Sequence, residues 1–417
     1  MKARTHFNTL LAALTLAIFT LTLPSADAQT GSVIYSFTGR TDGWGPAGGL
    51  VSDAAGNLYG TTVVGGEPGG CEGAGCGVVY KLSPTAAGWV QTVIYTFTGG
   101  ADGAEPWSGL VRDAKGDLYG VAGEHGNSGC LLNYGCGLVF ELSPSGSGWQ
   151  ETVLYAFSGG DDGSAPLNRL VMDHAGNLYG TTSEGGDLLN CPSHSLGCGG
   201  AFKLNRTQTG WTFTLLYDFT DSDSAEATSA LVLDAAGNLY GAGDAGPYGV
   251  IYELSPGSDG AWTDTLLHRF SNLAKGSGPT GLVFDAKGNL YGPTYSGGTG
   301  GDVYDCEDVR PGCGTLFKLS HGSGGWAETV LHNFTGNDPS PNGNLIFGPA
   351  GKLYGVDSSE VFMLFRDSNG VWTMTVPQTL TDTFPKGPLF IDKAGNLFGA
   401  TEGGGSDGYG SVFETTP

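Results

Sequence analysis

The sequence predicts an all-β protein, a seven-bladed β-propeller built from four-stranded antiparallel blades. Three observations lead to this prediction. A short motif returns seven times, each copy is accompanied by short apolar runs between glycine-rich turns, and the two ends of the chain carry complementary parts of one repeat. A four-stranded unit repeated at this scale is typical of propellers, whereas a sandwich would not repeat.

The repeated motif is a turn followed by a strand. Residues 53–60 read Asp-Ala-Ala-Gly-Asn-Leu-Tyr-Gly, and related octapeptides cover residues 113–120, 173–180, 234–241, 285–292, 348–355 and 392–399. Their central glycines are 60, 60, 61, 51, 63 and 44 residues apart. Aspartate at the head of a turn bonds the backbone ahead of it, and glycine supplies positive φ, so each motif predicts a tight turn.

Each repeat supplies four strands. In the second repeat we expect strands at 109–113, 118–122, 137–142 and 149–157, with turns at 114–117 and 143–148 and a long glycine-rich loop between the second and third strands. The first three strands are apolar on both faces, while the fourth alternates. This gradient predicts blades packed face to face, with the first strand innermost and the fourth at the outer edge.

The ends of the chain predict how the ring closes. The last repeat has strands at 389–392, 397–401 and 410–414 and lacks a fourth. Residues 32–37 match the fourth strands at 92–97 and 152–157. The N-terminal strand should therefore complete the last blade and leave no open sheet edge.

These repeats resemble the GloVer-type tandem repeat of secreted bacterial proteins. The resemblance rests on residues 93–103 and 153–163, on the Gly-Asn-Leu-Tyr-Gly segments, and on Val-Phe-Glu-Leu-Ser-Pro with its following Trp. It covers residues 31–417 and implies a propeller-like repeat and an extracellular setting, but no particular activity. Such proteins often carry C-terminal surface anchors. This sequence ends at a predicted third strand, so we expect release rather than anchoring.

The first 28 residues read as a secretory signal. Lys2 and Arg4 precede an apolar segment at 10–19, and Ala26-Asp27-Ala28 is a small-residue cleavage site. The alternative is an uncleaved anchor, for which the apolar segment is short. We expect a secreted, extracellular monomer with a single domain at 29–417; the periplasm is the other compartment compatible with such a signal.

The formal charge of −23 argues against nucleic acid and anionic membranes as partners, because both require clustered Lys and Arg. The acidity fits a protein kept soluble by its charge, or one that binds cations. No cofactor is expected. Calcium is the one ion considered, chiefly at the acidic segment 302–308, which matches no EF-hand spacing.

The eight cysteines form four local pairs, each in the loop after the second strand of its repeat. With a secretory signal they predict disulfides; a metal site is the alternative, which the four to six intervening residues disfavour. The pairs are Cys71/Cys76, Cys130/Cys136, Cys191/Cys198 and Cys306/Cys313.

The long loops that carry these cysteines should share one face with the loops between blades, and we expect binding there. Trp44 and Trp107 stand outside the repeat pattern, and an exposed indole suits stacking on a sugar, although both side chains could simply pack over neighbouring loops. The candidate ligand-binding residues are Trp44, Trp107, Asp42, Asp102, Glu105 and Asp162.

Acidic residues in the inter-blade loops have two interpretations. Brought round a ring, they could build a calcium site or an acid/base pair; alternatively they form a solvated face and turn bonds. Those considered are Asp42, Asp102, Asp161, Asp162, Asp221, Asp223, Glu226 and Asp338. His125 and His194, in the cysteine-bearing loops, are further candidates.

Motifs for nucleophilic, zinc-peptidase or phosphate chemistry are absent from the sequence, and no catalytic residue is predicted. The first hypothesis is therefore a non-catalytic binding or scaffold protein for a carbohydrate or another extracellular ligand. The alternative is a secreted carbohydrate-active hydrolase or lyase that uses carboxylates on the same face.

Overall fold

The computed structural model describes residues 30–67, 70–126, 130, 135–192, 194–221, 227–300, 312–336, 340–380 and 384–416. The signal segment, Cys306, Asp223, Glu226, Asp338 and the acidic segment 302–308 lie outside these residues. Within the described part, no helix is long and apolar enough to cross a membrane.

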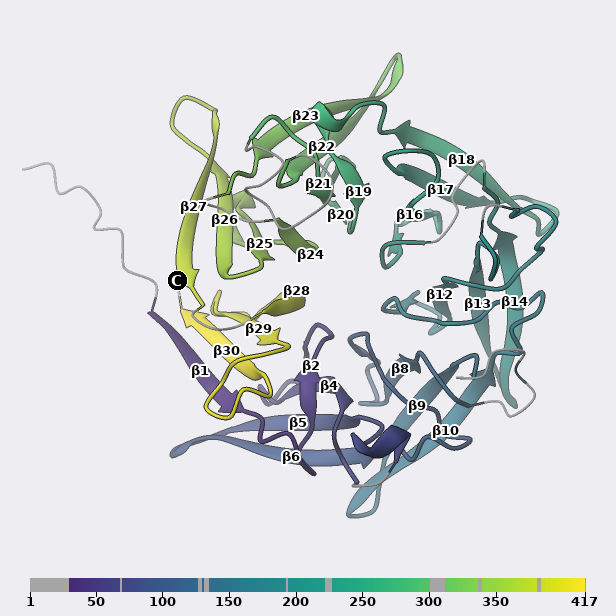
Figure 1. Cartoon of the computed structure of the whole chain (residues 1–417), viewed down its shortest axis with the longest axis vertical. Helices are drawn as coiled ribbons and strands as arrows, with labels where there is room; N and C mark the ends of the chain where they lie inside the picture. Colours follow the sequence, from purple (N-terminus) through teal and green to yellow (C-terminus); the bar gives the residue numbers. More distant parts are fainter. Residues whose placement is uncertain are drawn as a thin grey trace, which may run out of the picture.

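Seven antiparallel sheets stand around a central axis and form a ring (Figure 1), which confirms the predicted propeller. Blade 1 contains β2 (Trp44–Pro46), β3 (Val51–Ser52), β4 (Leu58–Val64), β5 (Val78–Thr85) and β6 (Gly88–Thr96). Blade 2 contains β7 (Val111–Arg112), β8 (Leu118–Ala122), β9 (Leu138–Ser145) and β10 (Gly148–Ala156). Blade 3 contains β11 (Val171–Met172), β12 (Leu178–Thr182), β13 (Gly200–Thr207) and β14 (Gly210–Asp218).

Blade 4 contains β15 (Val232–Leu233), β16 (Leu239–Gly243), β17 (Val250–Pro256) and β18 (Trp262–Arg269), and blade 5 contains β19 (Ser277–Pro279), β20 (Val283–Phe284), β21 (Leu290–Ser296), β22 (Thr315–Gly322) and β23 (Gly325–Asn333). Blade 6 contains β24 (Pro341–Phe347), β25 (Leu353–Asp357), β26 (Glu360–Arg366) and β27 (Trp372–Thr379). Blade 7 contains β28 (Pro385–Ile391), β29 (Leu397–Thr401), β30 (Ser411–Thr416) and β1 (Thr30–Ser36). Short 3-10 turns occur at Cys71–Gly73, Leu273–Lys275 and Pro349–Gly351.

The ring closes as predicted. β1 pairs antiparallel with β30, with Ser32 opposite Glu414 and Tyr35 opposite Val412, so the first and last parts of the chain lie side by side (Figure 1). Fully buried Phe37 packs between blades 7 and 1 in a cluster with Tyr80 and Val412. The remaining buried clusters likewise lie between neighbouring blades, so each blade is held by the two beside it.

The motif is a hydrogen-bonded turn. In blade 1, Oδ1 of Asp53 accepts bonds from the backbone N–H groups of Ala55 and Asn57, at 2.9 and 3.0 Å. Oδ2 accepts bonds from the Asn57 amide at 2.7 Å and the Tyr59 hydroxyl at 3.0 Å. Burial alone would raise the pKa of Asp53, but these bonds outweigh it and lower that pKa. The bonds from the asparagine amide and the tyrosine hydroxyl recur at Asp173, Asp234 and Asp285.

Three local expectations need correction. The turn expected at 143–148 is only Gly146-Ser147, because Ser145 and Gly148 already pair across β9 and β10. The first strand of blade 2, expected at 109–113, is reduced to Val111–Arg112. Trp44, expected in a loop, begins the short strand β2, where it pairs with Val64 of β4.

Candidate functional site

The connections at one end of the blades form a continuous surface, here called the loop face. It consists of the loops between the second and third strands of each blade and the loops between successive blades. Backbone bonds join the two sets: the N–H of Glu105 donates to the carbonyl of Cys76, and the N–H of Phe97 to that of Gly77. The motif turns lie at the other end, where Gly56 approaches Pro84 near the end of β5.

Disulfides close three loops of the loop face, as the sequence predicted. They join Cys71 to Cys76, Cys130 to Cys136 and Cys191 to Cys198, with Cα–Cα distances of 5.2, 5.6 and 5.8 Å. A disulfide of this kind stabilises a small loop by roughly 2 kcal/mol in the chain-entropy model.

The fourth predicted disulfide, Cys306–Cys313, is not among the three that the described residues contain, because Cys306 lies outside those residues. Cys313 itself is fully buried and packs in the cluster between blades 5 and 6 with Tyr291 and Phe334. It precedes β22 as Cys76 precedes β5, so it has the place in its blade that the repeat predicts. Its pairing with Cys306 stays a prediction.

The predicted aspartates each serve their own loop. Asp42 accepts a bond from the Tyr35 hydroxyl at 3.0 Å and bonds from the Thr38 hydroxyl and N–H at 2.6 and 2.9 Å. Burial alone would raise the pKa of Asp42, but the bonds from Thr38 and Tyr35 lower it. Asp102 and Asp162 accept the corresponding three hydrogen bonds in their own loops. These three carboxylates therefore fold their loops and do not gather at one site.

Trp107 and Glu105, by contrast, line a shared cavity of about 520 Å³ between blades 2 and 3. Leu167 and two further glutamates, Glu124 and Glu184, line it as well. The Trp107 side chain is 40% exposed, and its Nε1 donates to Oε2 of Glu105 at 3.3 Å. An exposed indole face among carboxylates suits a polyhydroxylated ligand, which offers C–H groups for stacking and hydroxyls as hydrogen-bond donors.

The backbone at Glu105 is in the left-handed region, with a φ of +54°. The equivalent residues of blades 1, 3 and 5 are Gly45, Ala165 and Gly278, with φ of +65°, +51° and +66°. A side chain with a Cβ is strained there by roughly 1 kcal/mol or more. Blade 2 thus carries a carboxylate on the cavity wall at a position where blade 3 has alanine and blades 1 and 5 have glycine.

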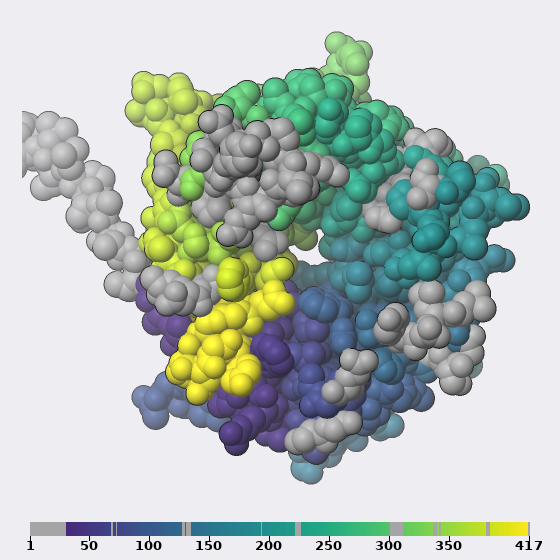
Figure 2. Space-filling view, in the orientation of Figure 1, coloured from purple at the N-terminus to yellow at the C-terminus, as the bar shows by residue number. Residues whose placement is uncertain are grey.

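The ring has a central opening (Figure 2). Arg169 lies two residues beyond Leu167 in the sequence and just before β11, the first strand of blade 3. Its Nε donates to the carbonyl of Leu110 at 3.0 Å and so connects blade 3 to blade 2. Burial lowers the pKa of this guanidinium. Among the described residues its remaining nitrogens have no hydrogen-bond partner, so this half-buried cation is available to an anionic group.

Trp44 has a different environment. It is exposed to a similar degree, 39%, but its ring packs edge-to-face against Tyr409 of blade 7, with centroids 5.4 Å apart. It is not among the residues that line the Trp107 cavity. The structure therefore separates the two tryptophans that the sequence grouped together.

Two larger cavities lie at the other end of the blades, of about 630 and 650 Å³. Their walls contain motif residues such as Asp53 and Asp285, which are already bonded within their turns. These cavities follow from the repeat itself, whereas the Trp107 cavity is built from residues that differ between repeats.

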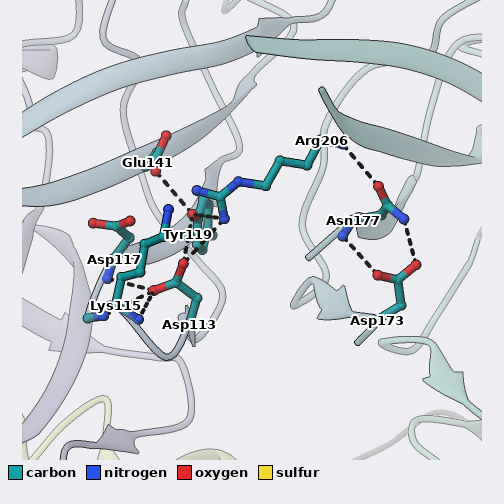
Figure 3. Close-up of polar contacts among 9 residues, drawn as sticks. Asp113, Lys115, Asp117, Tyr119, Glu141, Asp173, Asn177 and Arg206 are labelled. Carbon is teal, nitrogen blue, oxygen red and sulfur yellow. Dashed lines mark hydrogen bonds and ion pairs between the residues drawn. The ribbon is translucent and has the colours of Figure 1, made fainter. Parts of the chain in front are cut away.

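A charged cluster at the same end connects blades 2 and 3 (Figure 3). Nη1 of Arg206 lies 3.3 Å from Oδ2 of Asp113 and 3.1 Å from the Tyr119 hydroxyl. Tyr119 also donates to Glu141 at 3.0 Å. Blade 2 has Asp117 where five of the other motifs have asparagine, so no side-chain amide is present to bond Asp113, and arginine from the next blade takes that place. We assign this cluster to blade packing.

Sequence reasoning identified Trp107 and Glu105 but missed Glu124, Glu184, Leu167 and Arg169. A usable signal was present: Glu124 and Glu184 occupy equivalent positions just after β8 and β12, where the structure pairs them with Ala104 and Ser164. Only the ring arrangement shows that they reach one cavity.

Solved structures share this fold at low sequence identity. A streptogramin B lyase has a TM-score of 0.57 at 14% identity, covering 93% of this chain and 97% of that one. An inactive virginiamycin B lyase from Staphylococcus aureus with quinupristin has a TM-score of 0.58 at 13% identity, covering 93% and 99%. The extracellular domain of a Bacteroides thetaiotaomicron protein, described as a hybrid two component system, has a TM-score of 0.54 at 10% identity, covering 93% and 41%.

At these identities the structural likeness shows the fold alone. No curated protein matches the sequence. The Gloeobacter/Verrucomicrobia repeat matches residues 17–246, 75–305, 132–361 and 243–417, which together span nearly the whole chain. The chain therefore belongs to the Gloeobacter/Verrucomicrobia repeat family.

Proposed function

We propose that this protein is a secreted, non-catalytic binding protein that takes up a carbohydrate in the Trp107 cavity of its loop face. The observation that carries the proposal is the exposed Trp107 indole, held beside Glu105 in a cavity whose walls carry two more glutamates. The neighbouring disulfides support a loop surface that is ordered before the ligand arrives, which lowers the entropy cost of binding. They also support the secreted, oxidising setting proposed from the signal segment.

Binding of a panel of neutral, amino and acidic oligosaccharides to residues 29–417, followed by calorimetry, tests the proposal. Replacing Trp107 with alanine should weaken binding of the selected sugar at least about tenfold, since aromatic contacts of this kind contribute on the order of 1 kcal/mol or more. Trp44→Ala is the matched control, because Trp44 is equally exposed but lies outside the cavity. Equal losses in both variants, or no bound sugar, would contradict the proposal.

A second function, a hydrolase or lyase acting on a carbohydrate, is favoured by one observation. Three glutamates line the cavity, and the half-buried Arg169 guanidinium lies two residues beyond its wall. Glutamates can transfer protons, and a guanidinium can neutralise the carboxylate of an acidic sugar. Single Glu→Gln variants at 105, 124 and 184 distinguish the two functions. If the protein is an enzyme, at least one variant should lose turnover while still binding the sugar. If it is a binding protein, neither the unmodified protein nor any variant should show turnover.

A further inference from the structure

The disulfide loop of blade 3 differs chemically from the disulfide loops of blades 1 and 2. Cys191 and Cys198 bracket His194, and the side chain of Asp221 reaches them from the loop between blades 3 and 4. The four groups Cys191 Sγ, His194 Nδ1, Cys198 Sγ and Asp221 Oδ1 lie within 4.8 Å of one another. Among the described residues, this is the one group of three or more histidine, cysteine and acidic side chains close enough together to hold a metal ion.

Two departures from the repeat meet at this point. Asp221 stands two residues after Phe219, where the corresponding residues after Phe37, Phe97 and Phe157 are glycines. In blade 1, a Cβ added to the corresponding Gly99 would lie 2.7 and 2.8 Å from the sulfurs of Cys71 and Cys76. In blade 3, the Asp221 carboxylate occupies the space beside the disulfide, 3.4 and 3.6 Å from the two sulfurs. The blade 3 loop also holds the one cysteine pair in the sequence with a histidine, His194, between its two cysteines.

The distances match the edges of a metal tetrahedron. His194 Nδ1 lies 3.5 and 3.7 Å from the two sulfurs and 2.9 Å from Asp221 Oδ1, which itself lies 3.4 and 3.6 Å from the sulfurs. A zinc ion with Zn–S of about 2.3 Å and Zn–N or Zn–O of about 2.0 Å has ligand edges of about 3.3 to 3.8 Å. Four of the six edges lie in this range, the His194–Asp221 edge of 2.9 Å is shorter than it, and the sixth edge is the sulfur–sulfur bond.

Burial and charge agree with this interpretation. Both cysteines are buried, at 1% exposure, whereas His194 and Asp221 side chains remain 27% and 23% exposed, so an ion can enter from solvent. Disulfide sulfurs carry no proton to donate, so Asp221 gains no hydrogen bond from them. Two thiolates, an imidazole and a carboxylate are the ligand types that zinc prefers.

We propose that Cys191, His194, Cys198 and Asp221 form a zinc site when the Cys191–Cys198 disulfide is reduced, so that this loop is fastened by a disulfide in one state and by zinc in the other. A dithiol reductant supplies two electrons and two protons, cleaves the sulfur–sulfur bond and becomes a disulfide itself. Zinc then displaces both thiol protons to solvent. Rotation of the two cysteine side chains separates the two sulfurs, and the ion ties the disulfide loop to the segment that follows β14.

The direct test compares two disulfides in one molecule. The secreted chain is equilibrated anaerobically with graded dithiol, with and without Zn²⁺, and each pair is scored by alkylation and peptide mass spectrometry. Zinc should lower the dithiol concentration that half-reduces Cys191–Cys198 at least about tenfold, because it stabilises only the reduced form. Cys71–Cys76 should not shift. Equal shifts in both pairs, or none in either, would overturn the proposal.

Variants separate this site from nonspecific thiol binding. Asp221→Gly restores the residue found in the other repeats, and His194→Ala removes the imidazole; each should abolish at least about nine-tenths of the zinc-induced shift. The reduced protein titrated with Co²⁺ should show tetrahedral thiolate spectra that both variants lose and Cys71→Ser/Cys76→Ser keeps. Unchanged spectra in His194→Ala and Asp221→Gly would refute the ligand set. Sugar binding at Trp107 plays no part in these measurements.

Discussion

One position of the outer strand has different polar contacts in blades 1, 2 and 5, where it is occupied by Gln91, Glu151 and Glu328. In blade 1, the Gln91 amide donates to the carbonyl of Asp42 at 3.1 Å. In blade 2 the equivalent residue is Glu151, and its burial, followed by the charge of Asp102, raises its pKa to about 7. In blade 5 it is Glu328, whose buried carboxylate lies 3.1 Å from His268 and 3.0 Å from Lys275.

The two glutamates should respond oppositely to pH. The pKa of Glu151 is raised in the folded protein, so its ionisation destabilises the fold as pH rises from about 4.5 to 7. For Glu328, burial acts to raise the pKa, but His268 and Lys275 lower it below 4.5. Its contribution is therefore present above pH 4.5 and is lost as the medium becomes more acidic.

We predict that Glu151→Gln stabilises the protein at pH 8 by about 1 kcal/mol, after allowing for solvent screening of this half-buried group, and has little effect at pH 4. Glu328→Gln should destabilise it at pH 8 by about 1–2 kcal/mol, because Lys275 and His268 lose their charged partner. Urea unfolding at the two pH values measures both. A destabilised Glu151→Gln protein at pH 8 would show that Glu151 ionises without penalty.

At the scale of the element, the last glycine of the motif is required by packing. A Cβ added to Gly120 on β8 would lie 2.5 Å from the fully buried Phe140 ring of β9. Gly60, Gly180 and Gly241 meet Tyr80, Phe202 and Tyr252 in the same way. Each central strand thus leaves room for an aromatic ring from the next strand, and this ring forms the contact between blades.

We expect Gly120→Ala to destabilise the protein by about 2–3 kcal/mol, since neither the strand nor the buried ring can move aside cheaply. Gly148→Ala in the same blade is the control, because a Cβ there meets nothing within 4 Å and its φ is not left-handed. Chemical denaturation of both variants measures the difference. Similar stability in the two would show that β8 and β9 separate easily.

Strand order was predictable because pairing partners are adjacent in the chain, and β8 falls at the predicted residues 118–122. Turn lengths were less predictable. Pro144 and its neighbours looked like turn residues, yet Pro144 pairs opposite Trp149 within β9 and β10. Proline is tolerated there because β8 pairs with β9 only as far as Leu142, so Pro144 has a paired strand on one side only.

At the scale of the whole molecule, closure depends on seven residues. β1 supplies the outer strand of blade 7 and covers the edge of β30. Without it, β30 would expose unpaired N–H and C=O groups, and Phe37 would lose the strand that positions it between blades 7 and 1.

A chain beginning at residue 37 should therefore unfold at a lower temperature than one beginning at residue 29 and should associate through its exposed edge. Circular dichroism and light scattering coupled to size exclusion measure both effects. A truncated chain that remains monomeric with an unchanged melting temperature would mean that the ring is held by blade packing alone.

The sequence by itself determined the number of blades, their strand order, the closing strand and three of the disulfide pairs. These features depend on contacts within a repeat or on the identity of equivalent repeats. Only the tertiary structure decided which side chains meet across blades. Glu105, Glu124 and Glu184 belong to two repeats and share a cavity because adjacent blades bring their loops together, while Asp42, Asp102 and Asp162 bond locally and stay apart. The physical reason is that a turn bond is fixed by residues a few positions away, whereas a site between blades depends on the packing of the buried rings that set the ring's geometry.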